Sequence, residues 1–175
     1  MIDLLRKRMS IRSYLAKGIE DTIVKTLLEA AMLSPSSRDI KPWEFVVADD
    51  KKTIQQLALS KEHGAEFLRD APLVIAVIAN VEASDVWIED CSIASIIIQL
   101  EAESLGLGSC WVQIRCRETK NKEKSEDYVK KVLNIPLQYS VESLIGIGYP
   151  KERKKDNSKP VEWEKCSCNT FGNRI

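Results

Sequence analysis

The sequence has little of what several kinds of site and fold require. One histidine occurs among 175 residues, His63 in a charged stretch that predicts a helix surface, so a histidine-rich metal site is excluded and a catalytic triad is disfavoured. Lysine plus arginine equals aspartate plus glutamate at 26 each, so no bulk positive field would attract a nucleic acid or an anionic membrane. Because the charges balance, any anion site must be built from a local group of side chains. The longest apolar runs, 71–79 and 93–100, are much shorter than the roughly 20 residues that cross a bilayer.

Glycine and proline are also scarce, at seven and six residues. With 44% hydrophobic and 30% charged residues, the composition excludes a collagen, a disordered chain and a low-complexity scaffold. The length fits the roughly 100 to 200 residues of one domain, so residues 1–175 are expected to form a single domain. The five cysteines are an odd number, and the N-terminus lacks the pattern of a secretory signal. Reduced thiols and a cytoplasmic location are therefore expected.

Motifs for the commoner catalytic and metal sites are absent as well. The Gly-x-Gly pairs at 106–108 and 146–148 lack the third glycine of a dinucleotide fingerprint, and no Walker-type phosphate loop occurs. Cys110 has no base nearby in the sequence and is expected to be a small buried residue. Cys166 and Cys168 are too close together for a zinc knuckle. No metal is therefore expected.

Hydrophobic periodicity predicts an alternation of helices and strands. Strands are predicted at 43–48, 72–79, 109–114 and 141–147. Helices are predicted for a short first segment with Ile2, Leu5 and Met9 on one face, from Glu20 or Asp21 to a stop at Ser34-Pro35, and over 50–59, 84–105 and 125–133. The second strand does not alternate between apolar and polar residues, which is typical of a strand buried on both faces.

The helix predicted over 84–105 is apolar around most of its circumference. Its main stripe comprises Trp87, Cys91, Ala94, Ile98, Ala102 and Leu105. Three further large residues lie off that stripe, namely Ile93, Ile97 and Leu100. We therefore expect this helix to be central or to lie at a subunit interface. The final stretch, 151–175, holds Trp163 and Phe171, which must be buried somewhere, and a partner subunit is one candidate.

Arg8, Ser10 and Arg12 alternate along one segment after the first predicted helix. In an extended chain the period of two places all three side chains on the same side. Arginine offers a planar, permanently charged fork and serine offers a small donor, which together suit a phosphate group. A solvated charged turn is the alternative interpretation of the same pattern.

Two further segments could approach a ligand. Residues 34–43 form a predicted loop between helix and strand, with hydroxyl groups next to an aromatic strand start. They would serve a flat polar ligand or act only as a connector. Residues 105–112 carry glycines that let the backbone come close to a ligand.

Taken in order, these motifs resemble the nitroreductase family, the FMN-dependent NAD(P)H oxidoreductases that act as dimers. Residues 8–14 read Arg-x-Ser-x-Arg-x-Tyr, and 34–43 read Ser-Pro-Ser-Ser-x-x-x-x-Pro-Trp; both are similar to family signatures. Residues 106–111 and 146–150 are similar to two further blocks. The resemblance covers about residues 3–165.

The resemblance implies an α+β fold with a central mixed sheet flanked by helices, in an intertwined homodimer that holds FMN at the subunit interface. The helix over 84–105 would cross that interface, and 151–175 would be a tail packed on the partner. The implied cofactor-binding residues are Arg8, Met9, Ser10, Arg12, Pro35, Ser36, Ser37, Asp39, Gln113, Ile114, Arg153, Lys154 and Lys155.

Each part of that set has an implied role. Arg8 and Ser10 would hold the FMN phosphate, together with one cation from 153–155. Arg12 would lie at the pyrimidine edge of the flavin, and the backbone at 113–114 would approach its reactive nitrogen. Residues 35–39 would come from the partner subunit. No side chain is implied as a catalytic residue, because the flavin carries the hydride.

The implied activity is ping-pong transfer of hydride from NADH or NADPH through FMN to an electron acceptor such as a nitroaromatic or a quinone. One alternative is a flavoenzyme with a different acceptor, such as an enone or a halogenated aromatic. Another is a flavin-binding or structural dimer without turnover. Asp39, where the family usually has asparagine, and the bulky pair Gln113-Ile114, where a glycine-containing pair is frequent, favour this last alternative.

Overall fold

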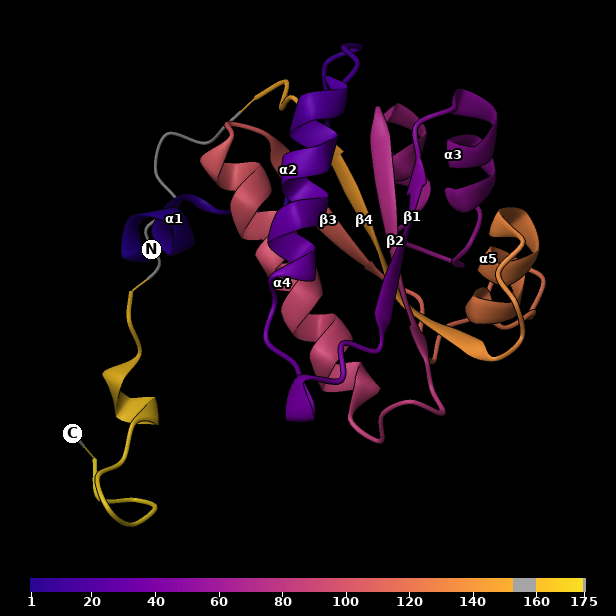
Figure 1. The fold of residues 1–175 in the computed structure, drawn as a ribbon. Coiled ribbons are helices and arrows are strands. Elements are labelled where there is room, and N and C mark those ends of the chain that lie inside the picture. Colours follow the sequence, from indigo (N-terminus) through magenta and orange to yellow (C-terminus); the bar gives the residue numbers. More distant parts are fainter. Residues whose placement is uncertain (153–159, 175) are drawn as a thin grey trace.

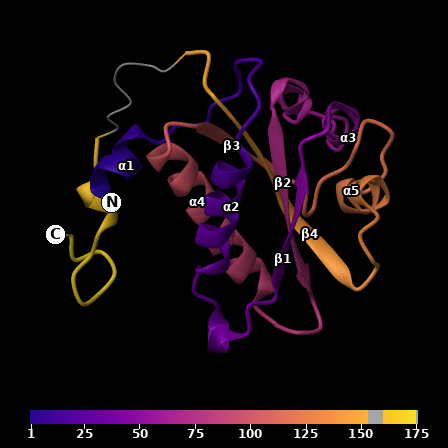
Figure 2. The same cartoon turned by 45° about the horizontal axis from the view of Figure 1, so that its top comes forward.

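The computed structural model describes residues 1–152 and 160–174, which build a four-stranded sheet between two pairs of helices (Figure 1). The strands are β1 (Trp43–Ala48), β2 (Leu73–Asn80), β3 (Gly108–Gln113) and β4 (Tyr139–Gly148). The helices are α1 (Ile2–Lys7), α2 (Asp21–Met32), α3 (Lys51–Leu57), α4 (Trp87–Ser104) and α5 (Ser125–Leu133), with 3-10 turns at Ser37–Asp39, Glu66–Asp70 and Trp163–Lys165. In both views α2 and α4 cover one face of the sheet, and α3 and α5 cover the other (Figure 1 and Figure 2).

The sheet has the strand order β1-β2-β4-β3, and each pair of neighbouring strands is antiparallel. The predicted α+β class is confirmed, and all four predicted strands are present. A mixed sheet of parallel and antiparallel strands was expected. Among the described residues, the parallel pairing is one isolated bridge between Ser10 and Ser109.

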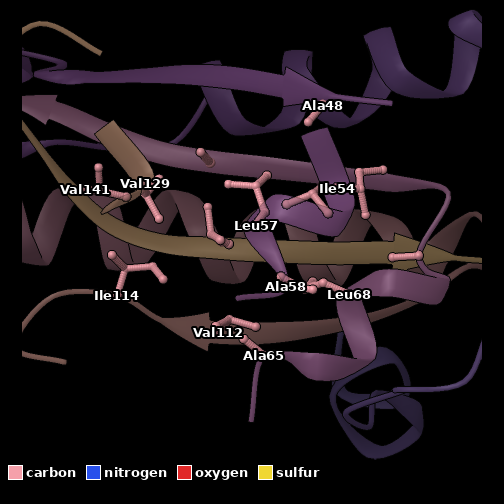
Figure 3. Close-up of a cluster of buried hydrophobic side chains, with 14 of the residues drawn as sticks. Ala48, Ile54, Leu57, Ala58, Ala65, Leu68, Val112, Ile114, Val129 and Val141 are labelled. Carbon is pink, nitrogen blue, oxygen red and sulfur yellow. The ribbon is translucent and has the colours of Figure 1, made fainter. Parts of the chain in front are cut away.

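Strand β2 is buried on both faces, as its non-alternating sequence predicts. Val74, Ala76 and Ile78 pack into a cluster on the α3–α5 side. The intervening residues, from Leu73 to Ala79, pack into a second cluster on the α2–α4 side. Figure 3 shows part of the first cluster, with Leu57 drawn between Val129 and Leu68. Two layers of helix therefore fix the strands that carry the candidate site.

The central stripe of α4 is buried against the sheet as predicted, although the helix begins three residues later than expected, at Trp87. Its fully buried apolar members are Cys91, Ala94, Ile98 and Ala102. Ile93 and Ile96 on the outer side stay 36% exposed, and Phe171 beyond the sheet is 94% exposed. Neither α4 nor any other helix in the described part of the chain is long and apolar enough to cross a membrane.

The first helix is shorter than predicted. α1 ends at Lys7 because Arg8 leaves helical geometry, with φ −58° and ψ 126°. Met9 therefore does not share a helical face with Ile2 and Leu5, which is a correction to the sequence-based prediction. Ile2 and Leu5 are exposed, whereas Met9 packs against the α3–α5 cluster.

Candidate functional site

The segment after α1 runs beside the start of β3. The Ile11 N–H donates to the Ser109 carbonyl oxygen at 3.0 Å, and Ser10 forms the isolated bridge with Ser109. Ile11 points into the core and is 6% exposed, whereas Ser10 and Arg12 on either side of it are exposed. This alternation confirms the extended conformation that the sequence predicts for the segment.

Two close approaches hold this segment against the sheet. A Cβ atom on Gly108 would lie 2.7 Å from Cβ of Ile11, and one on Gly148 would lie 2.7 Å from Cδ1 of Tyr14. The Tyr14 hydroxyl donates to the Ile11 carbonyl oxygen at 2.6 Å and lies 3.1 Å from that of Gly146. Burial raises the pKa of this hydroxyl, so it stays protonated as a donor. The last glycine of each Gly-x-Gly pair therefore serves the packing of this segment.

Cys110 on β3 lies where the N-terminal polar side chains converge. Burial raises the pKa of its thiol, and the guanidinium groups of Arg12 and Arg8 and a hydrogen bond with Ser10 act in the opposite direction. Cys110 is 1% exposed, which confirms the prediction of a small buried residue. Arg8, Ser10 and Arg12 therefore all act on the same thiol.

Arg12 carries a charge that no carboxylate neutralises within the described ranges, 1–152 and 160–174. Its guanidinium carbon lies 6.0 Å from the centre of the Phe67 ring, which is the outer limit of a cation–π contact. An exposed, uncompensated guanidinium next to a serine hydroxyl is suited to an anionic ligand.

The loop between α2 and β1 is held by hydrogen bonds to side chains. The Ser37 N–H donates to Oδ1 of Asp90 at 2.9 Å, and the Lys41 N–H donates to Oγ of Ser36 at 2.9 Å. Asp39 and Lys41 both have positive φ, 55° and 53°, which is uncommon for residues other than glycine. The Asp39 carboxylate pairs with Nζ of Lys41 at 3.1 Å, so a lysine beside it offsets its negative charge.

The two groups of predicted site residues lie at opposite ends of α4. Ser37 contacts Asp90 in the first turn of that helix, whereas Ser10 bridges to Ser109, which follows the last turn. α4 has 18 residues, which corresponds to about 27 Å at the rise of an α-helix. One chain therefore does not bring residues 8–12 and 35–39 to the same small ligand.

Gln113 and Ile114, predicted to approach the ligand at the end of β3, form hydrogen bonds with neighbouring residues of the same chain. The Gln113 side-chain amide accepts from Nε1 of Trp111 at 2.9 Å and donates to the Arg115 carbonyl oxygen at 3.2 Å. Ile114 is fully buried, and its N–H approaches the Glu142 carbonyl oxygen at 3.2 Å. The side chains at 113 and 114 and the N–H of Ile114 thus stabilise the end of the strand.

Glu142 occupies an irregular position in β4, opposite this pair. The register of β2 against β4 shifts here, since Val77 pairs with Ser143 and Ile78 pairs with Val141. Burial raises the pKa of the Glu142 carboxyl, against a hydrogen bond from Gln113 that lowers it. One oxygen, Oε2, has no hydrogen-bond partner in the described structure.

A pocket of about 730 Å³ lies just beyond β3. Its walls are 61–63 after α3, 115–118 after β3, and Lys124 and Glu126 at the start of α5. Sequence reasoning missed it because the walls come from three separate segments, although the run Arg-Cys-Arg directly after a strand was an available signal. His63, expected on a helix surface, is exposed here in a bend after α3.

Three further predictions concern the last phosphate cation, the thiols and metal binding. Arg153, Lys154 and Lys155 lie outside the described residues. All five cysteines are free. No cluster of three or more potential ligands that could hold a metal ion occurs within 1–152 and 160–174.

Comparison with known proteins gives consistent matches. The sequence profile of the Nitroreductase family matches residues 5–62 and 54–149. An Archaeoglobus fulgidus protein with the provisional name NADH dehydrogenase/NAD(P)H nitroreductase is 34% identical over 157 residues, covering 87% of each chain. The structure of an FMN-dependent nitroreductase from Clostridium difficile superposes with a TM-score of 0.94 at 44% identity, covering 98% of this chain and 100% of the other. An iodotyrosine deiodinase from Thermotoga neapolitana is 24% identical over 185 residues, covering 88% of this chain and 90% of the relative.

Proposed function

The chain belongs to the Nitroreductase family, and on that premise we propose that it is an FMN-dependent oxidoreductase that moves hydride from NADH or NADPH to a small-molecule acceptor. The observation that carries the proposal is the extended segment beside β3, anchored by the Ile11–Ser109 hydrogen bond, which leaves Ser10 and the uncompensated Arg12 exposed. Two guanidinium groups and a hydroxyl on one side of an anchored segment match the anionic phosphate and the polar edge of FMN.

The described residues supply binding and electrostatics. Arg8 and Ser10 would hold the phosphate of FMN, and Met9 between them would pack its side chain inward. Arg12 would place a fixed positive charge beside the pyrimidine edge, where reduction adds negative charge. FMN, when bound, would supply the hydride chemistry. The chain would orient the cofactor through the backbone at 113–114 and would need no side chain as acid or base.

A second copy of the chain would complete the site. Residues 8–12 and 35–39 lie at opposite ends of α4, so an antiparallel pairing of two such helices would bring one group from each chain together. The exposed outer side of α4, with Ile93 and Ile96, and the exposed Trp163 and Phe171 offer apolar surface for such a homodimer. Pro35, Ser36, Ser37 and Asp39 would then contact the flavin of the partner's site.

The acceptor would be a nitroaromatic or a quinone that enters after the oxidised nicotinamide leaves, in a ping-pong cycle. The relative from Thermotoga neapolitana is named as an iodotyrosine deiodinase, which supports a halogenated aromatic as the second candidate acceptor. A structural dimer without turnover is disfavoured, because Lys41 offsets the charge of Asp39 and the Gln113 side chain is engaged within the chain.

The test is an absorbance spectrum of the purified protein, followed by anaerobic addition of NADH and, separately, of NADPH. We expect a flavin spectrum that bleaches with at least one donor and returns when a nitroaromatic or quinone is added. A colourless protein that also fails to take up added FMN would overturn the proposal. A flavin that is bound but not reduced by either donor would replace it with the non-catalytic alternative.

A further inference from the structure

We propose that the pocket beyond β3 is an anion-selective subsite that receives a phosphate or carboxylate group carried by the hydride donor or by the acceptor. The inference rests on the proposed function, and it deepens that function by naming a charge requirement for one of the two substrates. The pocket volume, about 730 Å³, lies within the range of small-molecule sites.

The charges that line the pocket do not cancel. Four basic side chains line it, from Lys61, Arg115, Arg117 and Lys124, against three acidic ones, from Glu62, Glu118 and Glu126. Two of the acids are already paired with lysines outside the lining, at 3.1 Å for Glu62 with Lys122 and at 3.0 Å for Glu126 with Lys130. Glu118 alone is left to oppose the basic side chains of the wall.

The basic side chains themselves are mostly uncompensated. Lys61, Arg117 and Lys124 have no carboxylate within ion-pair distance in the described part of the chain. Arg115 is an exception, because it interacts with the buried carboxyl group of Glu142. Burial and the nearby charge of Arg117 lower the pKa of Lys61. The two cations therefore repel each other, and an anion bound between them would reduce that repulsion.

The walls of the pocket are fastened to each other. The Glu62 N–H donates to the Glu118 carbonyl oxygen at 2.8 Å, and Lys122 closes the same junction through its ion pair with Glu62. Glu118 and Lys124 form an isolated antiparallel bridge. A preformed site loses less conformational entropy when a ligand binds, so the pocket is suited to binding without rearrangement.

One strand links the pocket to the candidate flavin site. The pocket residues 115–118 follow the end of β3, and Ser10 of the candidate site bridges to Ser109 on the same strand. The Lys61 ammonium group also interacts electrostatically with the Cys110 thiol of that strand. Arg115 directly follows the buried Ile114 at the end of β3. A substrate that lies over the proposed flavin would therefore reach the pocket with a charged substituent.

The test compares pairs of substrates that differ by one anionic group, the 2′-phosphate of NADPH or the carboxylate of a nitroaromatic, in the flavin-loaded protein. The donor arm measures KM for NADPH and for NADH. The acceptor arm measures kcat/KM for 4-nitrobenzoate and for the neutral 4-nitrobenzamide. We compare Lys61→Gln and Arg117→Gln with the control Lys52→Gln, an exposed lysine on α3 outside the pocket. FMN content and the far-ultraviolet spectrum check that each variant is folded and loaded.

In one of the two arms, each pocket variant is expected to raise KM or lower kcat/KM about tenfold for the substrate that carries the extra anionic group. That is the size of one charge-assisted hydrogen bond. The constants of the control are expected to stay within twofold of wild type. Loss in the donor arm assigns the anion to the nucleotide, and loss in the acceptor arm assigns it to the acceptor. Glu118→Gln is expected to change affinity in the opposite direction, because it removes the one unpaired acid. Unchanged constants in both arms, in protein that still turns over, would overturn the proposal.

Binding without turnover separates this inference from the proposed function. Calorimetric titration with 2′,5′-ADP and with 4-nitrobenzoate needs no electron transfer, so it tests the pocket even if the protein fails to reduce its flavin. Binding of either probe that is weakened by Arg117→Gln supports the pocket. If neither probe binds the wild-type protein, the anion subsite is wrong, whatever the redox assays show.

Discussion

Gly108→Ala is expected to damage stability and cofactor binding together. The added methyl group would lie 2.7 Å from Cβ and Cγ1 of Ile11 and 2.8 Å from its Cγ2, whereas carbon atoms prefer about 3.5 to 4.0 Å. A rotamer change cannot relieve a clash with Cβ, so the segment carrying Ser10 and Arg12 must move by about 1 Å. Overpacking typically costs about 1 to 3 kcal/mol, and stretching the Ile11–Ser109 hydrogen bond adds about 1 kcal/mol.

The assay is thermal unfolding at one fixed protein concentration, combined with fluorescence titration of FMN. A loss of about 2 to 4 kcal/mol corresponds to a fall in Tm of roughly 4 to 16 °C for a chain of this size. Gly18→Ala is the matched control, because nothing lies within 4 Å of its added Cβ and its φ is not positive. Equal Tm and FMN affinity in the two variants would refute the claim that Gly108 sets the position of the binding segment.

Three further predictions concern single side chains. Arg8→Ala is expected to lose FMN during gel filtration, whereas Arg12→Ala is expected to keep the cofactor and slow its reduction in stopped-flow traces. If FMN content and reduction rate were unchanged in both variants, Arg8 and Arg12 would not be part of the FMN site. Because burial raises the pKa of Glu142, the folded chain binds that proton more tightly than the unfolded chain and loses stability as pH rises from the ordinary glutamate range to the raised native value. In urea unfolding, Glu142→Gln should therefore gain stability relative to wild type as pH rises above the ordinary glutamate range of about 4. A stability difference that does not change with pH would contradict this. Asp90→Ala removes the acceptor of the Ser37 N–H and is expected to cost about 1 to 3 kcal/mol; urea unfolding that matches wild type would show that the contact is dispensable.

Local sequence patterns predicted the elements whose burial they encode. The run at β2 does not alternate because helices cover both faces of the sheet, and the stripe on α4 is read from its helical period. The alternation of polar and apolar residues was sufficient to predict that Ser10 and Arg12 are exposed, because Ile11 between them is apolar and faces the core.

The features that prediction missed depend on contacts between distant segments. Met9 looked helical by spacing, yet the bridge between Ser10 and Ser109 draws the chain away from α1. The direction of strand pairing is likewise set by the whole topology. The roles of Gly108 and Gly148 depend on which side chains lie against them, and the basic pocket depends on three loops that only the folded chain brings together.

The placement of residues 8–12 and 35–39 at opposite ends of α4 has a consequence for mixed populations of chains. In the proposed homodimer each site draws one half from each subunit, so a chain damaged at Arg8 and a chain damaged at Ser36 would each be inactive alone. Co-expressed, half of the dimers would be hybrids, and each hybrid would hold one intact site and one doubly damaged site, for about a quarter of normal activity. Defects at the two ends of one helix would then complement each other between chains, whereas two defects at the same end would not.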